Sequence, residues 1–345
     1  MEENKQHKTA LPETEPIPSA QAPEALLDIR DLRVEYHTDE DVVYAVNGLD
    51  LTIGKGESLG LVGETGAGKT TTALSVLRLI ADPPGKIMGG EIWFEGEDML
   101  QAKPARLREI RGSKISVIFQ DPMTSLNPVY SVGDQIAEVI HQHEKCSKEE
   151  GRRKAGDMLE MVGIPRARYD EYPHQFSGGM KQRVMIAIAL ACSPELLIAD
   201  EPTTALDVTI QAQVLELMKK LKQEYQTSLI LITHDLGVVA KICDKVAVVY
   251  AGEIVESGTL KEIYTDKRHP YTIGLFDSLP DIENDASTLK VIQGMVPDPA
   301  NLPDGCKFHP RCPYATEACQ TGKIKPVKLS DSHMVRCNRF SDTEV

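Results

Sequence analysis

The sequence is poor in aromatic residues and has no long apolar segment. Only 5% of its 345 residues are Phe, Trp or Tyr, and its longest strongly apolar run, Val184 to Cys192, is nine residues long. A helix that spans a bilayer needs about 20 apolar residues, so we expect no membrane crossing. Residues 1–24 lack the apolar core of a secretory signal and are rich in Glu, Pro, Gln and Ala, which predicts a disordered leader.

Basic residues are also scarce, and the cysteines form no regular framework. The chain has 38 Lys and Arg against 52 Asp and Glu, a formal net charge of −14. Nucleic-acid-binding proteins usually carry a basic excess on at least one domain, so we expect no nucleic-acid partner. Of the seven cysteines, three are scattered and four lie near the C-terminus. This distribution favours a reducing compartment and a ligand site over disulfides.

Strand patterns alternate with helical patterns along most of the chain. Residues 26–37 and 42–53 alternate apolar and polar side chains, as half-buried antiparallel strands do. The later strands are continuously apolar and separated by helices, which predicts an α/β fold with a largely parallel sheet. Residues 127–175 contain only helical patterns and predict an inserted helical subdomain. The later predicted strands cover 58–62, 115–120, 195–200, 228–234 and 245–258.

Residues 63–70, GETGAGKT, fit the phosphate-loop pattern G-x-x-x-x-G-K-[ST] between a predicted strand and a predicted helix. The glycines let backbone N–H groups point at phosphates, and the helix N-terminus adds partial positive charge. Lys69 is suited to neutralise β- and γ-phosphate oxygens, and the Thr70 hydroxyl is suited to bind Mg²⁺. A plain glycine turn would not explain Lys69 and Thr70 in this register. The predicted ATP-binding residues here are Gly63, Glu64, Thr65, Gly66, Ala67, Gly68, Lys69, Thr70 and Thr71.

Two acidic residues, Asp200 and Glu201, stand where the apolar strand 195–200 ends. Ligands of open α/β folds bind at this edge of the sheet. Asp200 is suited to hold Mg²⁺ and its waters, and Glu201 is suited to orient and deprotonate an attacking water. Taken alone, the pair is equally well explained as a helix N-cap. Its position downstream of a phosphate loop favours the catalytic interpretation.

A second anion-binding helix start is predicted at Ser177, Gly178 and Gly179, which place a hydroxyl and two glycines before a helical segment. The simpler alternative is Ser177 as an N-cap followed by flexible glycines. One nucleotide has little use for two such sites in one subunit. The pattern therefore favours a second copy of the fold that supplies one of them.

The order of these motifs resembles that of the ATP-binding-cassette (ABC) ATPases of transporters, over about residues 26–258. The resemblance implies a P-loop NTPase cassette over residues 25–264, with a parallel-sheet core, an antiparallel β subdomain and a helical subdomain at about 121–180. It also implies a head-to-tail dimer, with each ATP between the phosphate loop of one subunit and the signature of the other. The motifs, in order, are the phosphate loop 63–71, Gln120 at a strand end, Ser177-Gly178-Gly179, the acidic strand 196–201, Ala205-Leu206-Asp207 and His234 after a strand.

Further site residues follow from this resemblance. Gln120 would contact Mg²⁺ and the attacking water, His234 would contact the γ-phosphate, and Asp207 would order the interface. A lone histidine in such a position is more often a capping or core residue. Tyr36, just upstream of the phosphate loop, is the candidate for stacking on adenine, with Tyr44 as its competitor. A tyrosine in a strand is more often a packing residue.

The signature departs from the family's commonest form. Phe176 replaces Leu, and Met180 replaces Gln. Ser177 and both glycines are retained, so the phosphate contact is expected to survive. Because Met180 has no side-chain amide, the sequence does not predict how the opposite subunit is oriented.

The tail resembles the C-terminal extension of dipeptide, oligopeptide and nickel importer ATPases, through 268–272 (RHPYT) and 302–313 (LPDGCKFHPRCP). This resemblance implies an ATPase subunit at the cytoplasmic face of the cell membrane, bound to two transmembrane permease subunits and paired with a second, related ABC ATPase. It implies import of peptides, or less often of nickel or metal chelates, captured outside by a substrate-binding protein. The alternative is a soluble cassette ATPase that acts on nucleic acid or ribosomes, which the acidic, single compact cassette disfavours.

We expect the tail, residues 265–345, to be a separate module whose core is too small to be stable without cross-links. Its four cysteines are spaced C-x5-C-x6-C-x17-C, with longer gaps than in paired zinc sites. Four thiolates also suit an iron–sulfur cluster, and the importer resemblance implies a [4Fe-4S] centre. Zinc and free thiols stay open as alternatives, with His309 and His333 as spare ligands. A redox sensor that gates hydrolysis is compatible with the cluster. The four are Cys306, Cys312, Cys319 and Cys337.

Overall fold

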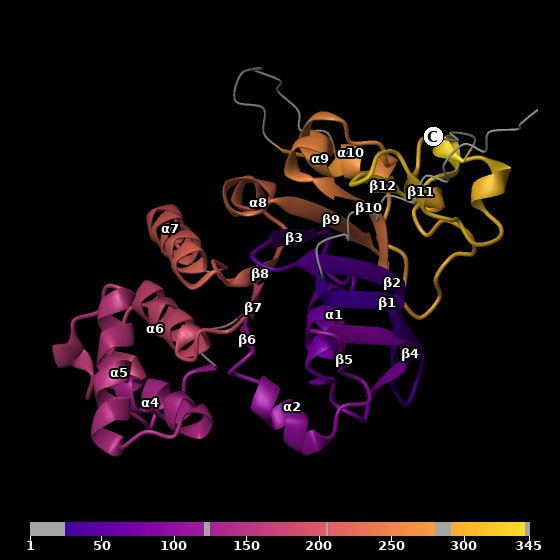
Figure 1. Cartoon of the computed structure of the whole chain (residues 1–345). Coiled ribbons are helices and arrows are strands. Elements are labelled where there is room, and N and C mark those ends of the chain that lie inside the picture. The colour runs from indigo at the N-terminus through magenta and orange to yellow at the C-terminus, as the bar shows by residue number, and fades with distance from the viewer. Residues whose placement is uncertain (1–24, 121–124, 205, 280–290, 342–345) are drawn as a thin grey trace, which may run out of the picture.

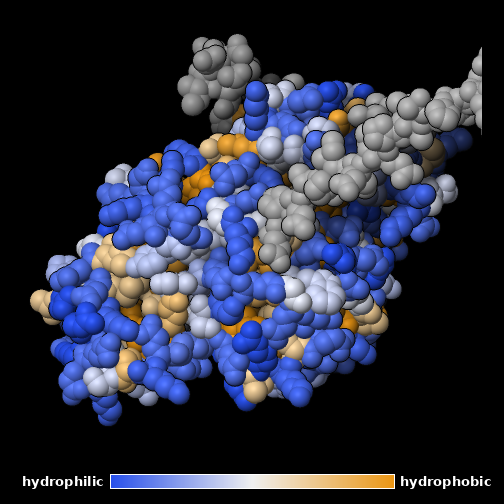
Figure 2. Space-filling view, in the orientation of Figure 1, coloured by the Kyte–Doolittle hydropathy of each residue, from blue (hydrophilic) through white to orange (hydrophobic). Residues whose placement is uncertain are grey.

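The computed structural model describes residues 25–120, 125–204, 206–279 and 291–341, and the predicted leader lies outside these ranges. Two sheets make the framework, with a layer of helices to one side and the C-terminal tail against the edge of the larger sheet (Figure 1). No helix in the described ranges is long and apolar enough to cross a bilayer. The face seen in Figure 2 is mostly hydrophilic, with small apolar patches.

The smaller sheet is antiparallel and has the strand order β2-β1-β4-β5. Its central strand β1 pairs with β2 on one side and β4 on the other, so that Val34 lies opposite both Val46 and Ile87. Its apolar side chains face inward, as the alternation of the sequence predicts. The strands are β1 (Ala25–His37), β2 (Val42–Gly54), β4 (Gly85–Phe94) and β5 (Glu97–Asp98).

The larger sheet has eight strands in the order β11-β12-β10-β9-β3-β8-β7-β6. The five strands β9, β3, β8, β7 and β6 are parallel, and β10, β12 and β11 join antiparallel at one edge. The central strands β3, β7 and β8 are buried throughout, which explains their continuous apolar runs. The strands are β3 (Ser58–Val62), β6 (Ile115–Ile118), β7 (Leu196–Asp200), β8 (Ser228–Thr233), β9 (Lys245–Tyr250), β10 (Glu253–Thr259), β11 (Val327–Lys328) and β12 (Met334–Val335).

Helices cover both faces of the larger sheet. Residues Leu196 and Ile198 of β7 belong to the core shared with α1 and the antiparallel sheet, and Leu197 and Ala199 belong to the core shared with α6–α8. Helices α4–α6 pack on one another as the predicted helical layer. The predicted combination of sheets and helices is therefore confirmed. The helices are α1 (Lys69–Val76), α2 (Pro104–Ile110), α4 (Val132–His143), α5 (Lys148–Met161), α6 (Gly178–Leu190), α7 (Val208–Tyr225), α8 (Leu236–Ile242), α9 (Leu260–Thr265) and α10 (Pro270–Asp277).

One predicted strand is wrong. Residues 245–258 form the hairpin β9–β10 and not a single strand, with Ala251 and Gly252 at the turn. Both turn residues have positive φ, 46° and 78°, which is the backbone of the two-residue hairpin turn whose twist matches that of the strands. The glycine was the available signal for this turn.

The tail, which the sequence predicts to be a separate module, pairs with the larger sheet. Strand β12 pairs with β10 through Val335 and Glu256, and β11 pairs with β12, so the tail extends the larger sheet. Phe308 is 2% exposed and packs against Tyr250 and Tyr271. Strands of two residues are too short to leave a periodic pattern, and for that reason the sequence does not reveal them.

Candidate nucleotide-binding and catalytic site

The phosphate loop joins β3 to α1, and two of its glycines are required by close neighbours. A Cβ on Gly68, which is the left-handed N-cap of α1 with φ 98°, would lie 2.3 Å from the carbonyl oxygen of Ala45. A Cβ on Gly63 would lie 2.2 Å from the carbonyl oxygen of Val249. Because real Cβ contacts are longer, only glycine lets the loop lie this close to β2 and β9.

Lys69 points back into its own loop. Its Nζ donates to the carbonyl oxygens of Gly63, at 2.7 Å, and Glu64, at 2.9 Å, and the residue is 7% exposed. Burial lowers the pKa of this amine, and the charges of Glu201, Asp200 and Glu64 oppose that effect. A buried ammonium surrounded by loop carbonyls is suited to exchange one of them for a phosphate oxygen.

Two of the three residues predicted to hold Mg²⁺, Thr70 and Asp200, come from different elements and lie together. Asp200 ends β7 and is 5% exposed, and burial raises the pKa of its carboxyl while a hydrogen bond from Thr70 lowers it. A hydroxyl and a carboxylate are the oxygen ligands that Mg²⁺ accepts, with water completing its shell. The donor set therefore fits this ion.

Glu201 follows Asp200 in a strained left-handed conformation, with φ 45°. Gln120 Nε2 and Thr204 Oγ1 each donate to Glu201 Oε2 at 2.9 Å, and His234 Nδ1 lies 3.2 Å from Oε1. Burial acts to raise the pKa of Glu201, but these contacts outweigh it and lower the pKa. The carboxylate is therefore ionised at neutral pH and able to accept a proton.

Thr204 is a site residue that sequence reasoning missed. It lies three residues after Glu201, and its hydroxyl contacts the carboxylate of Glu201. The short run Pro202-Thr203-Thr204 after the two acids is the only local signal for it. The three catalytic candidates Glu201, Gln120 and His234 are brought together, from the ends of β7, β6 and β8.

The predicted signature lies at the start of α6. Ser177 occupies the N-cap position, but its side chain makes no capping hydrogen bond. No hydrogen bond among the described residues joins Ser177, Gly178 or Gly179 to the phosphate loop. Gly179 packs on α7, because a Cβ there would lie 2.4 Å from Ile210 Cγ2.

Phe176 and Met180, the two residues at which the signature differs from the family's commonest form, both contact Arg168. The guanidinium of Arg168 lies 4.2 Å from the ring centroid of Phe176 and donates to the sulfur of Met180 at 3.3 Å. Asp207 is exposed and caps α7 by accepting from the backbone N–H of Ile210. These residues thus lie on the helical side of the molecule.

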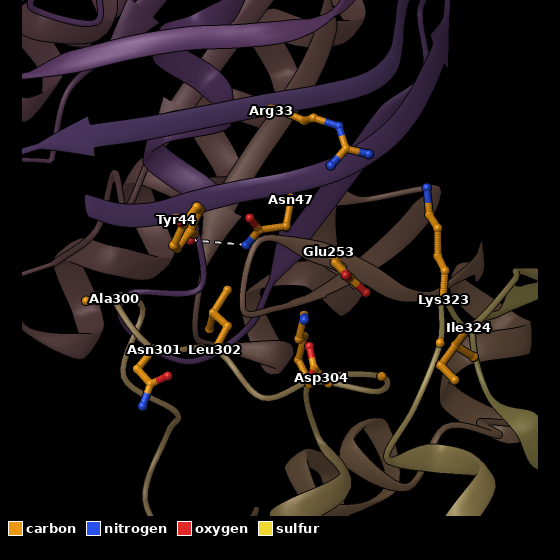
Figure 3. Close-up of a pocket in the computed structure, with 13 residues that line it drawn as sticks. Arg33, Tyr44, Asn47, Glu253, Ala300, Asn301, Leu302, Asp304, Lys323 and Ile324 are labelled. Carbon is orange, nitrogen blue, oxygen red and sulfur yellow. Dashed lines mark hydrogen bonds between the residues drawn. The ribbon is translucent and has the colours of Figure 1, made fainter. Parts of the chain in front are cut away.

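The two adenine candidates occupy different places. The hydroxyl of Tyr36 lies 3.3 Å from Thr71 Oγ1, at the first turn of α1. Tyr44 is 40% exposed and donates its backbone N–H to Pro299 of the tail. In Figure 3, Tyr44 and Asn47 face tail residues across a groove of about 600 Å³ that also contains Glu253. Tyr36 is therefore the tyrosine beside the phosphate loop.

The four tail cysteines have free thiols and lie near one another. Burial raises the pKa of Cys306 to about 11, with a smaller contribution from the other three thiols, and it also raises the pKa of Cys312 and Cys337. The backbone N–H groups two positions on, those of Phe308, Tyr314 and Arg339, act against burial and lower these three pKa values.

The described residues show no metal-ligating geometry at the cysteines. Among the described residues, no three side chains of His, Cys, Asp or Glu are arranged as ligands of one ion. His309 Nδ1 lies 2.9 Å from the carbonyl oxygen of Cys306, and His333 is paired with the buried Glu256 at 2.9 Å. His333 is therefore engaged in the core and does not serve as a spare ligand.

Comparisons with known proteins agree with this geometry. The ABC transporter family matches residues 46–204, and the family described as the oligopeptide/dipeptide transporter C-terminal region matches residues 255–319. The oligopeptide transport ATP-binding protein AppD of Bacillus subtilis is 50% identical over 92% of this chain and 97% of its own length. OppD of the same organism is 51% identical over 90% of this chain and 88% of its own.

Solved structures are similar over the cassette. The ATP-binding cassette MJ0796, described as dimeric and bound to ADP and Pi, has a TM-score of 0.61 and 28% identity. The match covers 68% of this chain and 98% of that one. The shared part thus includes nearly the whole of the smaller protein.

Proposed function

The chain belongs to the ABC transporter family and carries the C-terminal region of its oligopeptide/dipeptide members, and from this membership we propose that it hydrolyses ATP to drive peptide import. The observation that carries the chemistry is the meeting of Lys69, Asp200 and the hydrogen-bonded Glu201 at the carboxyl edge of the sheet. Import of nickel or a metal chelate is the alternative within the family. The peptide assignment is supported by relatives at about half identity that are named for oligopeptide transport.

In hydrolysis, the oxygen of water attacks the γ-phosphorus while the bond to the bridging oxygen breaks. Glu201 accepts the proton of that water, and Gln120 and His234, which contact the same carboxylate, position the water and the γ-phosphate. Lys69 binds the phosphate oxygens. Thr70, Asp200 and Gln120 would hold Mg²⁺, which supplies positive charge at those oxygens.

Glu201→Gln tests the assignment of the base. The amide keeps the shape of the side chain but cannot accept the proton, so we expect kcat to fall by about 10²- to 10⁴-fold while the affinity for Mg-ATP is retained. Glu216→Gln, on the exposed face of α7, is the matched control and should leave both values unchanged. Unchanged hydrolysis by Glu201→Gln would remove Glu201 from the role of base.

We also propose that two cassette subunits complete each nucleotide site, and that the second is a related ABC ATPase. The uncapped Ser177 and the two glycines after it offer a helix N-terminus to an anion, and their own phosphate loop makes no hydrogen bond with them in the described chain. The similar cassette MJ0796 is described as dimeric. Chemistry is then coupled to closure of the dimer.

The helical layer offers a surface for the membrane subunits. Val129 and Tyr130 are 72% and 54% exposed beside α4. Tyr130 also lines a groove of about 490 Å³ with charged residues of α4 and α5, among them Asp134, Lys148 and Arg152. We propose that this groove takes a cytoplasmic loop of a permease subunit and that the protein lies at the cytoplasmic face of the membrane. A substrate-binding protein would reach it only through that complex.

For the tail we propose a [4Fe-4S] cluster on the four cysteines, with Zn²⁺ as the alternative. The proposal is supported by four free thiols in one segment whose charges and neighbouring backbone N–H groups act on one another's pKa values, because thiolates are the ligands of such clusters. Iron, zinc and acid-labile sulfide should be measured on protein isolated without oxygen. Four iron and four sulfide per chain support the cluster. One zinc per chain, or no metal at all, would overturn it. Cys319→Ser should lower the metal content.

A further inference from the structure

We propose that two tail residues, Arg311 and Tyr271, are positioning residues of the phosphate loop, acting through Glu64. This inference rests on the proposed ATPase function and adds the tail to the nucleotide site. Arg311 Nη1 donates to Glu64 Oε2 at 2.7 Å, and Nη2 donates to Oε1 at 3.1 Å. The hydroxyl of Tyr271 accepts from the backbone N–H of Glu64 at 2.9 Å. The tail thus holds both the side chain and the backbone of one loop residue.

Arg311 is itself rigidly placed. Its side chain is 5% exposed, its Nε donates to the carbonyl oxygen of Gln293, and its Nη1 lies 3.4 Å from the Tyr250 hydroxyl. The guanidinium lies 5.9 Å from the ring centroid of Phe308. A planar guanidinium with two parallel bonds to a carboxylate fixes direction as well as charge, which lysine does not. The position of Glu64 is therefore set by the packed tail.

Glu64 transmits this position to the phosphate-binding lysine. Its carbonyl oxygen accepts from Lys69 Nζ at 2.9 Å and from the backbone N–H of Ala67 at 3.2 Å. Glu64 is therefore held by the tail on its N–H and carboxylate, and by the loop on its carbonyl. A shift of Glu64 changes where Lys69 meets a phosphate.

The ion pair between Arg311 and Glu64 also neutralises the negative charge of Glu64. Glu64 is a carboxylate inside a loop that has to accept the β- and γ-phosphates of ATP, and its side chain is only 27% exposed. Unpaired, its negative charge would repel those phosphates at short range. Arg311 neutralises that charge from the side of the tail. Loss of Arg311 alone should therefore weaken nucleotide affinity more than loss of Glu64, or of both residues, does.

The test compares Arg311→Gln, Glu64→Gln and the double variant in the full chain, with Arg268→Gln as a matched control. Arg268 is another tail arginine, paired with the surface residue Asp266. The measured quantities are the equilibrium affinity for a fluorescent ATP analogue, and KM and kcat of the intact transporter complex. Metal content and the unfolding midpoint show whether each variant has the folded tail.

We expect Arg311→Gln to weaken affinity and raise KM by about tenfold, the effect of one lost charged hydrogen-bonded pair, with kcat changed less than about threefold. The amide of Glu64→Gln carries no charge and keeps an oxygen that can accept from Arg311, so this variant should weaken affinity less than Arg311→Gln does. The double variant should bind more tightly than Arg311→Gln, because it lacks the unpaired carboxylate. Arg311→Lys should restore affinity in part, and Arg268→Gln should change nothing. A double variant that binds no more tightly than Arg311→Gln would show that the unpaired charge of Glu64 does not oppose the phosphates, and that result overturns the proposal.

An unchanged affinity in Arg311→Gln also overturns the inference and leaves the ATPase function standing. Absence of Mg-ATP binding in the unaltered protein would instead contradict the proposed function. Should Arg311→Gln fail to fold, Tyr271→Phe provides a second variant. It removes only the hydroxyl that accepts from the Glu64 N–H, and it should raise KM without changing metal content. An unchanged KM in that folded variant would count against the proposal.

Discussion

Single glycines determine how closely the phosphate loop packs on the sheets. Gly66 and Gly68 both have positive φ, 80° and 98°. A Cβ on Gly66 would meet nothing within 4 Å, whereas a Cβ on Gly68 would meet the carbonyl of Ala45 at 2.3 Å. An alanine would therefore meet a similar backbone strain at both positions, and only at Gly68 would it also meet a steric clash.

Gly66→Ala and Gly68→Ala separate these two effects. We expect Gly66→Ala to reduce the free energy of unfolding by about 1–2 kcal/mol, the strain of an L-residue in the left-handed region. Gly68→Ala should reduce it by about 3 kcal/mol or more, because overpacking against β2 is added. Urea unfolding without nucleotide gives both values. Equal losses would show that the neighbouring strand yields and that Gly68 is not sterically required.

The residues of local motifs could be predicted from the sequence, whereas those joined by long-range contacts could not. Lys69 and Glu201 belong to patterns of a few residues whose chemistry is readable without a structure. Arg311 and Glu64 lie 247 positions apart, and no spacing rule connects them. The buried His333 is a spare metal ligand by sequence alone, because its partner Glu256 lies 77 positions away and no spacing rule connects the two.

At the scale of elements, the caps explain where helices begin and how the tail is attached. Thr259 and Glu262 form a capping box at α9, in which each side chain binds the other's backbone N–H. The hydroxyls of Ser330 and Ser332, from the tail, donate to the same carboxylate at 2.7 and 2.9 Å. One glutamate thus caps a helix and holds the turn between β11 and β12.

Glu262→Gln should lose stability in a pH-dependent way. Burial acts to raise the pKa of Glu262, but the hydrogen bonds from Ser330, Thr259 and Ser332 outweigh it and hold the pKa at about 2, against 4.5 for the unfolded chain. The ionised form therefore stabilises the fold above pH 4.5, and this contribution disappears as pH falls toward 2. We expect a deficit of about 1 kcal/mol at pH 7, the size of a helix cap. Unfolding midpoints should converge as pH falls from about 4.5 toward 2, and a constant gap would contradict this role.

The elements missed by sequence reasoning are short or interrupted by a single turn. The hairpin β9–β10 contains one continuous apolar pattern, and only Ala251 and Gly252 break it. Strands β11 and β12 have two residues each and exist because β10 offers an edge to pair with. Their stability comes from tertiary pairing, which no local propensity reports.

The whole molecule is organised around a nucleotide site that is complete on one side and open on the other. The tail adds strands to the larger sheet, a Phe308 anchor to its core and Arg311 to the phosphate loop. The signature at Ser177 remains on the helical side without a hydrogen bond to that loop in the described chain. We propose that partner subunits complete this arrangement in a peptide importer.

The most direct test is affinity isolation of Glu201→Gln with Mg-ATP from gently solubilised native cells, with the retained proteins identified by mass spectrometry. Lys69→Ala, which lacks the phosphate-binding amine, is the control without ATP-dependent closure, and Tyr130→Asp tests the permease groove. The account predicts two multi-span membrane proteins and a second ABC ATPase, with the ATPase reduced in Lys69→Ala and the membrane proteins reduced in Tyr130→Asp. Recovery of only a homodimer, ribosomes or nucleic acid would contradict it.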